Sequence, residues 1–369
     1  MSERSILFAG GGTGGHLYPG LAIARTLVRL DPTAKPIFVG AQRGIERTVL
    51  PASEFPHLLL DLHPLYRARP WENWRTVRGA VSAWRALDAL VKRERPRLVV
   101  GTGGYAAGVA LAYAVRHHIP IVQQAGDSHP GLTARAFKRW TREYYLAFPE
   151  AGRVIGGDPS RFVDTGAPIE PPPQPLPDRA AARQAWNFPA HGGHVLLIYG
   201  GSQGSLAINR VVAEWVQRGI PENLYVIWMT GRASFAEFAT LEGDRVRVRE
   251  YLSPIAGAYA AADLALARAG AMTTSELFAW RIPGVLVPLP TAAADHQSAN
   301  ARALQAAAAA INLPQSELTV DRLDSTITSL LSAPGEMARL SAGAAARARP
   351  HAAETIARRI LALLDSASR

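Results

Sequence analysis

Cysteine is absent from this chain of 369 residues, and so are two other features that would point to a secreted or membrane-spanning protein. Without cysteine the chain forms neither disulfides nor thiolate metal sites, which fits a reducing compartment. The longest apolar run, Ala106 to Val115, is too short to span a bilayer. Met1 to Arg4 leads directly into an apolar, strand-like run without the pattern of a signal peptide. We therefore expect a soluble intracellular protein.

Acidic residues are scarce in one window, Leu65 to Arg97, where arginine and tryptophan collect. Aromatic rings beside cations are typical of a protein surface that meets anionic lipid headgroups. Two alternatives are a nucleic acid, whose phosphates also attract arginine, and an amphipathic helix that packs its tryptophans inward. We expect an anionic membrane surface and no nucleic acid. The residues concerned are Arg67, Arg69, Arg75, Arg78, Arg85, Lys92, Arg93, Arg95 and Arg97, with Trp71, Trp74 and Trp84.

A glycine-rich turn near the N-terminus is the most informative stretch of the sequence. Four apolar residues, Ile6 to Ala9, run into five glycines and His16, and the helix-compatible segment Leu21 to Leu30 follows. A buried strand that stops in glycines and restarts as a helix leaves backbone N–H groups directed at one spot, which attracts an anion. Glycine allows a ligand to approach the backbone closely. The pattern therefore predicts a ligand-binding turn.

The chain lacks the acidic residue that would turn this motif into a dinucleotide site. Gly10, Gly12 and Gly15 satisfy G-x-G-x-x-G, but that motif also needs a carboxylate at the end of the second strand. The expected second strand, residues 36–42, ends without one, and Asp31 precedes it. Nicotinamide and flavin binding are therefore disfavoured. We expect no cofactor, and because no acidic cluster suggests a metal site, no metal.

Apolar runs alternate with helical segments in two series, one before and one after the proline-rich stretch Pro168–Pro177. Continuous apolar strands are typical of parallel sheets covered on both faces, so each series indicates an α/β domain. We expect an N-terminal domain at 1–166, a linker at 167–177, a C-terminal domain at 178–345, and a helix at 346–369 that packs back toward the N-terminal domain. The expected strands are 6–9, 37–39, 98–100, 119–122, 195–199, 224–228, 246–248, 264–266 and 284–288.

The second series contains two further candidate anion sites. Gly200 to Ser205 repeats the strand–glycine–helix turn, and residues 268–276 place small residues before a helix, where a diphosphate can rest on the helix start. Glu276, one turn in, is placed to accept hydrogen bonds from both ribose hydroxyls, or else is a first-turn carboxylate that favours the helix dipole. Asp295 to Gln297 offers polar groups for a sugar and by itself predicts a helix N-terminal cap.

Six motifs occur in the order found in one enzyme family. They are GGTGGHLYPG (11–20), GTGGY (101–105), PGLT (130–133), GGSQGS (200–205), RAGAMTTSEL (268–277) and DHQxxNA (295–301). Together they resemble the bacterial UDP-N-acetylglucosamine:undecaprenyl-diphospho-muramoyl-pentapeptide N-acetylglucosaminyltransferases, which make lipid II. The resemblance covers nearly the whole chain.

This resemblance implies the GT-B fold, an α/β architecture in which two Rossmann-like parallel-sheet domains face each other across a cleft. It implies that the N-terminal domain holds the undecaprenyl-diphosphate-linked muramoyl-pentapeptide and the C-terminal domain holds UDP-N-acetylglucosamine. It also implies peripheral attachment to the cytoplasmic face of the cell membrane, in agreement with the Leu65–Arg97 window.

The resemblance further implies a role for individual residues. Leu252 would hold uracil through its backbone, residues 271–274 would cradle the diphosphate, Glu276 would bind ribose, and Gln297 would contact the sugar hydroxyls. The donor contacts implied are Thr13, Gly14, Gly15, Asp127, Ser202, Leu252, Ala271, Met272, Thr273, Thr274, Ser275, Glu276 and Gln297; the acceptor contacts are His16, Gly104 and Tyr105.

His16 is the best candidate for the catalytic base. The acceptor's 4-hydroxyl attacks the anomeric carbon and inverts it, so a base must take the hydroxyl proton. Imidazole titrates near neutrality, and the glycine turn aims this one at the substrates. The alternative is a residue at a helix start that only bonds nearby backbone. Charge on the departing UDP would fall on two glycine-rich helix starts, so the chemistry requires no metal.

Three positions depart from the family pattern. Within residues 124–127, Ala125 replaces a glutamate and Asp127 an asparagine, and Glu170 replaces an arginine that faces phosphate. A carboxylate beside a diphosphate weakens its binding. Two alternatives therefore stay open: a related GT-B transferase with another UDP-sugar or acceptor, and a weakened homologue that acts as a binding scaffold. The cations we consider as compensation are Arg232 and Arg268.

Overall fold

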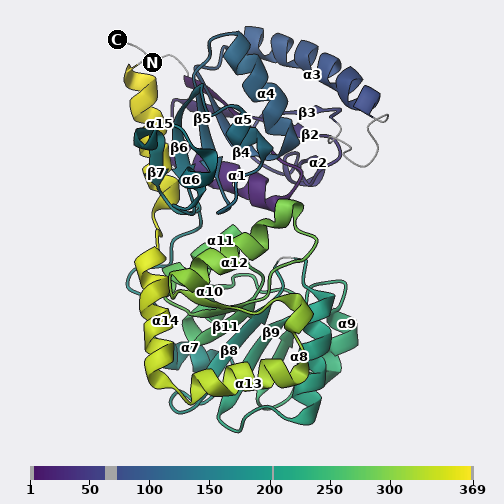
Figure 1. Ribbon diagram of the computed structural model, residues 1–369, viewed down its shortest axis with the longest axis vertical. Coiled ribbons are helices and arrows are strands. Elements are labelled where there is room, and N and C mark those ends of the chain that lie inside the picture. The colour runs from purple at the N-terminus through teal and green to yellow at the C-terminus, as the bar shows by residue number, and fades with distance from the viewer. Residues whose placement is uncertain (1–3, 63–72, 202, 367–369) are drawn as a thin grey trace. The chain divides into compact units, whose positions relative to one another are not determined.

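The computed structural model describes residues 4–62, 73–201 and 203–366, which form two compact units. Unit 1 comprises Met1–Glu170 with His351–Arg369, and unit 2 comprises Pro171–Pro350. Each unit is built on a parallel sheet with helices on both faces (Figure 1). This confirms the predicted α/β architecture of two parallel-sheet domains.

The sheet of unit 1 has seven strands in the order β3-β2-β1-β4-β5-β6-β7. Ile6 to Ala9 are each at most 1% exposed, because the strand they form is covered on both sides. The connections leave β1 and β4 in opposite directions, and ligands bind beyond the carboxyl ends of strands at such a switch point. The strands are β1 (Arg4–Gly10), β2 (Ala34–Ala41), β3 (His57–Leu60), β4 (Leu98–Gly103), β5 (Ile121–Ala125), β6 (Thr141–Leu146) and β7 (Phe162–Asp164).

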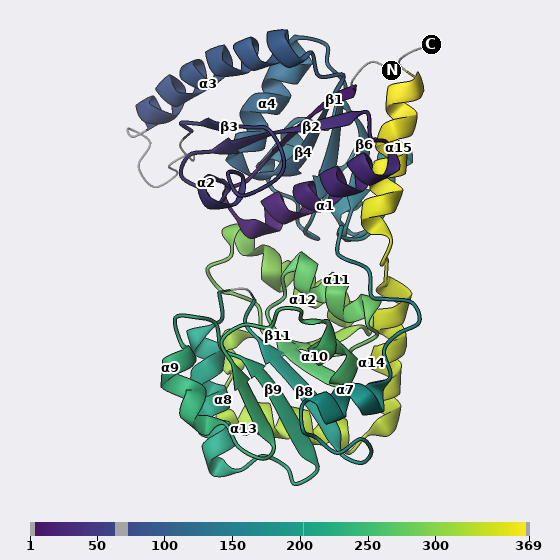
Figure 2. The ribbon, with the colours of Figure 1, turned by 180° about the vertical axis from the view of Figure 1, so that it is seen from behind.

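Helices cover both faces of this sheet. Leu17, Leu27 and Ile360 belong to the core on one face, where α1 and α15 lie side by side (Figure 2). Leu87 and Leu111 belong to the core on the other face, beneath α3 and α4. The helices are α1 (Gly14–Leu30), α2 (Glu46–Val49), α3 (Asn73–Glu94), α4 (Gly104–Arg116), α5 (Leu132–Ala136), α6 (Ala151–Ile155), the 3-10 turn η2 (Pro159–Arg161) and α15 (Ala352–Ser366).

Two element boundaries in unit 1 differ from the predicted ones. Helix α1 begins at Gly14 rather than near Leu21 and contains Pro19. Glycine and proline are poor helix formers, but the burial of Leu17 against the sheet outweighs their propensity. Strand β5 begins at Ile121 because Pro120 has no N–H for the sheet, although its carbonyl still accepts from Val99 N.

Unit 2 repeats the arrangement with six parallel strands in the order β10-β9-β8-β11-β12-β13, so its switch point lies between β8 and β11. Its strands are β8 (His194–Tyr199), β9 (Leu224–Met229), β10 (Val246–Arg249), β11 (Leu264–Ala267), β12 (Gly284–Leu286) and β13 (Ala310–Asn312). Its helices are α7 (Arg179–Ala185), α8 (Leu206–Arg218), α9 (Phe235–Phe238), η3 (Ala239–Leu241), α10 (Ala256–Ala261), α11 (Ala271–Ala279), η4 (Ala293–Asp295), α12 (His296–Ala306), η5 (Gln315–Glu317), α13 (Val320–Leu331) and α14 (Pro334–Arg347). Every strand expected here is present, and β13 adds one that was not predicted.

Candidate functional site

The first glycine turn lies at the switch point of unit 1, between β1 and α1, and internal partners occupy two of its N–H groups. Gly11 N donates to Gly103 O at 3.2 Å. Gly12 N donates to Glu46 Oε1 at 2.8 Å, with Gly12 at a φ of +89° that favours glycine. At the start of α1, His16 N donates to Thr13 O at 3.2 Å. The amides left for a ligand are therefore those of Gly14 and Gly15, at the very start of the helix.

Glu46 is a residue of this site that the sequence analysis missed. Its side chain is fully buried, and Oε1 also accepts from Ala41 N at 3.1 Å. The second strand does end without a carboxylate, as expected, but this one follows a few residues later in α2 and turns back beneath the glycine turn. The available sequence signal was the pair of glycines at 40 and 44, which give the side chain room.

His16 lies against both glycine-rich turns of unit 1. Its Nδ1 is 3.2 Å from Gly11 O and 3.2 Å from Thr13 Oγ1. A Cβ added at Gly103 would come within 2.6 Å of the His16 ring, so the ring lies close to that backbone. A carbonyl oxygen only accepts hydrogen bonds, so Nδ1 carries the proton and Nε2 has the lone pair.

The structure brings several predicted residues of unit 1 together around this imidazole. Tyr105 packs on the same turn, since its ring is 3.1 Å from a Cβ built at Gly12. Gly104, in a left-handed conformation at the start of α4, accepts from Thr133 Oγ1 at 3.2 Å. Thr13, Gly14 and Gly15 form the start of α1 beside His16.

The second glycine turn, between β8 and α8, has a buried cation behind it. Ser205 caps α8 and accepts from Arg268 at 2.7 Å, and Arg268 also donates to the carbonyls of Val287 and Pro288. Burial lowers the pKa of Arg268 to about 10, which leaves it charged at pH 7. Ser202, a predicted phosphate contact, lies outside the described residues.

Neither arginine considered as compensation for Glu170 is placed as a free phosphate ligand. Arg268 is 7% exposed, and its donors are engaged by carbonyls, by Ser205 and by Gln315 Oε1 at 2.7 Å. Arg232 is exposed and lies 3.3 Å from Glu250. Arg268 can therefore attract an anion electrostatically over a distance, but it does not donate a hydrogen bond to it. Glu170 itself is exposed at the end of unit 1.

The start of α11 offers backbone donors to an anion. Ala271, Met272 and Thr273 form its first turn, whose N–H groups have no acceptor within the helix. Thr274 differs from them, because its N–H and its hydroxyl both bond Gly270 O, at 3.0 and 3.1 Å. Of the residues predicted to bind the diphosphate, only Ala271, Met272 and Thr273 therefore offer a backbone N–H that the helix leaves without an acceptor. Ser275 lies on the second turn of α11.

Glu276 is held from behind by two buried tyrosines. Tyr259 donates to Glu276 Oε2 at 2.9 Å, and the Tyr199 and Tyr259 hydroxyls are 3.2 Å apart. Burial, together with the neighbouring tyrosine and carboxylate, raises the pKa of Tyr259 well above its ordinary value, so it remains a neutral donor. The Trp280 ring packs against Tyr259, with centroids 5.8 Å apart. This support fixes the direction of the carboxylate.

Two other residues of unit 2 that were predicted to contact the nucleotide sugar already make hydrogen bonds within the protein. Gln297 Oε1 accepts from Leu289 N at 3.0 Å, which leaves its amide N–H groups as donors. Leu252 is buried, and its N–H bonds Met229 Sδ at 3.3 Å. Asp295 is the N-cap residue of α12, as predicted, but its backbone is left-handed and its side chain makes no capping bond.

In unit 1, position 125 differs from position 127 in its surroundings. Ala125 is buried in an apolar cluster with Tyr144, Leu146 and Ile155. Asp127 follows β5 and is half-buried. Ala125, which stands where the family pattern has a glutamate, is therefore part of the apolar core.

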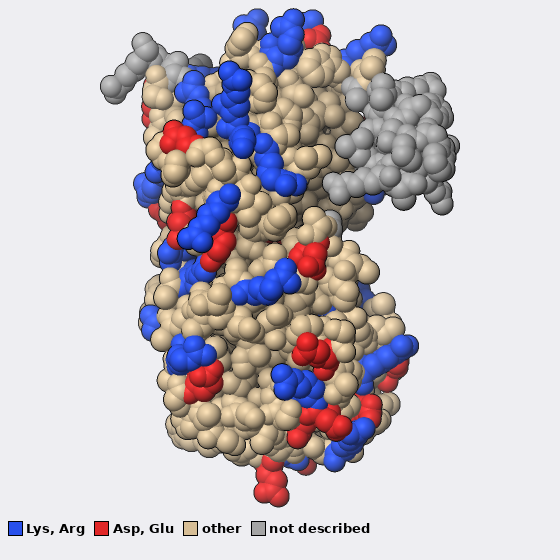
Figure 3. All heavy atoms as spheres, viewed as in Figure 1, with Lys and Arg blue, Asp and Glu red and all other residues tan. Residues whose placement is uncertain are grey.

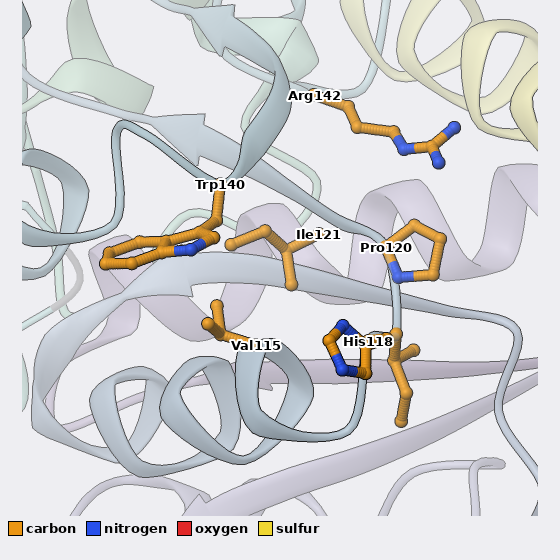
Figure 4. A pocket seen from close by; sticks show the side chains of 7 residues that line it. Val115, His118, Pro120, Ile121, Trp140 and Arg142 are labelled. Atoms are coloured by element: carbon orange, nitrogen blue, oxygen red, sulfur yellow. The ribbon is translucent and has the colours of Figure 1, made fainter.

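A small pocket lies beside the C-terminal end of α4 in unit 1. The pocket holds about 180 Å³ and is lined by Val115, His118, Ile119 and Arg142, with the half-exposed Trp140 across from Val115 (Figure 4). On the face of unit 1 seen in Figure 3, lysine and arginine predominate over acidic residues. The exposed Trp140 and the cationic Arg142 thus line the same pocket.

Only part of the predicted basic and aromatic window can be compared with the structure. Residues 65–72 of it, including Trp71, lie outside the described residues, as does the Trp74 side chain. Trp84 packs on Tyr113 and His117 of α4, with ring centroids 5.0 and 6.3 Å apart. For Trp84, therefore, the alternative of an amphipathic helix that packs its tryptophans inward is confirmed. Within the described ranges, each helix is too short or too polar to span a membrane.

Comparison with known proteins agrees with this geometry. Residues 6–146 match the N-terminal domain of glycosyltransferase family 28, and residues 195–356 match its C-terminal domain. UDP-N-acetylglucosamine–N-acetylmuramyl-(pentapeptide) pyrophosphoryl-undecaprenol N-acetylglucosamine transferases are similar over almost their entire length. The one from Salinibacter ruber is 39% identical over 99% of both chains. The one from Symbiobacterium thermophilum is 37% identical over 97% of this chain and 96% of its own.

Solved structures give the same result for the fold. The crystal structure of Acinetobacter baumannii MurG superposes with a TM-score of 0.76 at 26% identity, covering 97% of this chain and 99% of that one. CalG4, the calicheamicin glycosyltransferase, superposes with a TM-score of 0.68 at 19% identity, covering 99% and 100%. The second likeness concerns the fold alone.

Proposed function

This chain belongs to the family of UDP-N-acetylglucosamine–N-acetylmuramyl-(pentapeptide) pyrophosphoryl-undecaprenol N-acetylglucosamine transferases, and we propose that it catalyses their reaction with His16 as the base. The reaction moves N-acetylglucosamine from UDP to the 4-hydroxyl of the lipid-linked muramoyl-pentapeptide and so converts lipid I to lipid II. The observation that carries the assignment of His16 is its Nδ1 contact with Gly11 O, which leaves Nε2 able to accept a proton.

The bond changes follow from inversion at one carbon. The acceptor oxygen forms a bond to the anomeric carbon while the bond from that carbon to the diphosphate breaks, and the hydroxyl proton moves to His16 Nε2. The departing UDP gains negative charge on its terminal phosphate. The first-turn amides of α11 and the field of buried Arg268 stabilise that charge, because fixed dipoles act strongly where water is excluded.

Unit 2 binds the donor in this scheme. Glu276 accepts from the ribose hydroxyls, and Tyr259, which donates to its Oε2, holds the carboxylate in place. Gln297 donates its amide N–H groups to sugar hydroxyls, since its carbonyl is already engaged. The backbone at Leu252 reads uracil. In unit 1, the donor contacts we propose are Thr13, Gly14, Gly15 and Asp127, and the acceptor contacts are His16, Gly104 and Tyr105.

The acceptor named for the relatives carries undecaprenol, so the enzyme has to work at a lipid surface. We place that surface on the cytoplasmic face of the membrane, against the outer part of α3 and the end of α4. Its support is the exposed Trp140 beside the pocket and the exposed cations nearby. These cations include Arg116, Lys138, Arg139 and Arg142.

Vesicle binding tests the membrane surface. Arg142→Ala should weaken binding to phosphatidylglycerol vesicles by about fivefold, because each cation near an anionic surface contributes about 1 kcal/mol. Trp140→Ser should weaken it as well, whereas Tyr251→Ser, an equally exposed aromatic in unit 2, should leave it unchanged. Equal losses for Trp140 and Tyr251 would contradict this placement.

Two substitutions test the assigned roles. His16→Ala should retain UDP affinity, measured by calorimetry, and lower turnover of a lipid I analogue by about 10²-fold or more. Glu276→Ala should weaken UDP binding by about tenfold, because two hydroxyl bonds to a charged group are lost. Full turnover by His16→Ala would exclude it as the base. UDP binding without any product at high enzyme concentration would instead favour the scaffold that Ala125 and Glu170 leave open.

A further inference from the structure

A buried carboxyl group lies directly behind the turn that carries His16. Glu46 has no exposed surface, and its Oε1 accepts from two backbone amides, Gly12 N and Ala41 N. Its Oε2 is buried without a hydrogen-bond partner in the part of the chain that the structure describes. A buried carboxyl oxygen that lacks a partner costs free energy, so its retention calls for an explanation beyond packing.

Three glycines make room for this side chain. A Cβ added at Gly11 would lie 1.7 Å from Glu46 Oε1, and one at Gly44 would lie 2.0 Å from Oε2. A Cβ at Gly40 would approach Glu46 Cγ to 2.8 Å. The glycines around the first turn thus accommodate a buried carboxyl group as well as any ligand.

One peptide group connects Glu46 to the imidazole. The carbonyl of Gly11 and the N–H of Gly12 belong to the same planar peptide, in which the two groups point in opposite directions. The N–H donates to Glu46 Oε1 at 2.8 Å, and the carbonyl lies 3.2 Å from His16 Nδ1. Fixing the N–H therefore fixes where the carbonyl points. It also strengthens the carbonyl as an acceptor, because linked hydrogen bonds polarise one another.

We propose that Glu46 is a positioning residue which, through the Gly11–Gly12 peptide, holds His16 with its proton on Nδ1. Glu46 touches no substrate. Its role is to keep the carbonyl in front of Nδ1, so that Nε2 keeps the lone pair that takes the acceptor's proton. Without that carbonyl, Nδ1 would still have Thr13 Oγ1 as a neighbour, and a hydroxyl can donate to it as well as accept. The inference rests on the proposed role of His16.

The tautomer of His16, read by ¹⁵N NMR of the imidazole, is the decisive measurement. In the wild type the neutral ring should carry its proton on Nδ1. Glu46→Leu removes the acceptor of Gly12 N, so the ring should become a mixture of tautomers. Glu46→Gln keeps an acceptor oxygen for both amides, so the wild-type tautomer should return. An unchanged tautomer in Glu46→Leu, or a mixture in Glu46→Gln, would overturn the inference.

Kinetics provide the second readout. Glu46→Leu should lower kcat for a lipid I analogue by about tenfold to 10²-fold, because small misplacements of a catalytic group have effects of that size. The KM for UDP-N-acetylglucosamine should rise by a smaller factor than kcat falls, since Glu276 and the start of α11 in unit 2 are unchanged and only the proposed donor contacts at Thr13 to Gly15 adjoin the altered peptide. Glu46→Gln should keep kcat within about threefold. A KM rise as large as the kcat loss would contradict a positioning role.

Leu27→Ala is the control for a purely structural effect. Leu27 is a fully buried residue of α1 in the same unit and makes no contact with the turn's hydrogen bonds. Its truncation should lower stability while leaving the His16 tautomer unchanged, so a tautomer change there would count against the inference. If Glu46→Leu does not fold, the tautomer of Glu46→Gln still decides. If His16→Ala keeps full turnover, the proposed base is wrong, whereas the tautomer results stand independently.

Discussion

The two glycine turns of this molecule follow the same sequence pattern, but a buried carboxyl group contacts the first and a buried guanidinium contacts the second. Behind the first turn, Glu46 takes the N–H of Gly12. Behind the second, Arg268 donates to Ser205, the cap of α8. A carboxyl acceptor competes with an anion for backbone donors, while a buried cation attracts one. With the roles proposed above, the same kind of turn would fix the base in one unit and favour a diphosphate in the other.

The largest expected effect comes from removing the cation behind the second turn. Arg268→Met should lower the free energy of unfolding of unit 2 by about 3–5 kcal/mol, because three buried acceptors and the half-buried Gln315 lose a charged donor. Urea unfolding measures this. Arg232→Met, an exposed arginine of the same unit, is the matched control and should change stability by less than about 1 kcal/mol. Equal effects would show that the buried hydrogen bonds of Arg268 contribute nothing.

The two units can also be compared by how their stability depends on alkaline pH, since each contains a buried tyrosine. Burial raises the pKa of Tyr199 in unit 2 and of Tyr145 in unit 1. The unfolded chain releases these protons near pH 10 and the folded chain retains them, so stability is complete below about pH 10 and falls as pH rises.

Each such tyrosine should contribute up to about 1.4 kcal/mol per pH unit above pH 10. Unfolding followed at several pH values measures the slope. Tyr199→Phe should flatten the slope for unit 2 and Tyr145→Phe that for unit 1. A slope that neither substitution changes would contradict the assigned ionisations.

The smallest predicted effect concerns the support of Glu276. Tyr259→Phe should weaken UDP binding by about fivefold, because the carboxylate loses one hydrogen bond of about 1 kcal/mol and its fixed direction. Calorimetry with UDP measures it. Tyr225→Phe removes a hydroxyl from strand β9 of the same unit, is the control, and should leave UDP affinity unchanged. If Tyr259→Phe binds UDP like the wild type, Glu276 does not depend on it.

The fold was predictable from sequence because the buried strands are apolar and several stop in glycine, a local and repeated signal. Partners distant in sequence were not predictable. Glu46 reaches Gly12 from α2, and Arg268 reaches Ser205 from the end of β11; only the tertiary fold brings either pair together. Local signals also misplaced the start of α1, where packing decides. They placed the cap of α12 correctly at Asp295 but did not predict its left-handed backbone, with which it makes no side-chain capping bond.

Site-resolved hydrogen exchange with saturating UDP tests the central claim most directly, namely that an anion binds backbone amides of unit 2 and not the amides of the first glycine turn, which have internal acceptors. UDP should slow exchange of the amides of Ala271, Met272 and Thr273 and leave those of Gly11 and Gly12 unchanged, since these already have internal partners. Slowed exchange at Gly11 and Gly12, with none at the start of α11, would contradict the account.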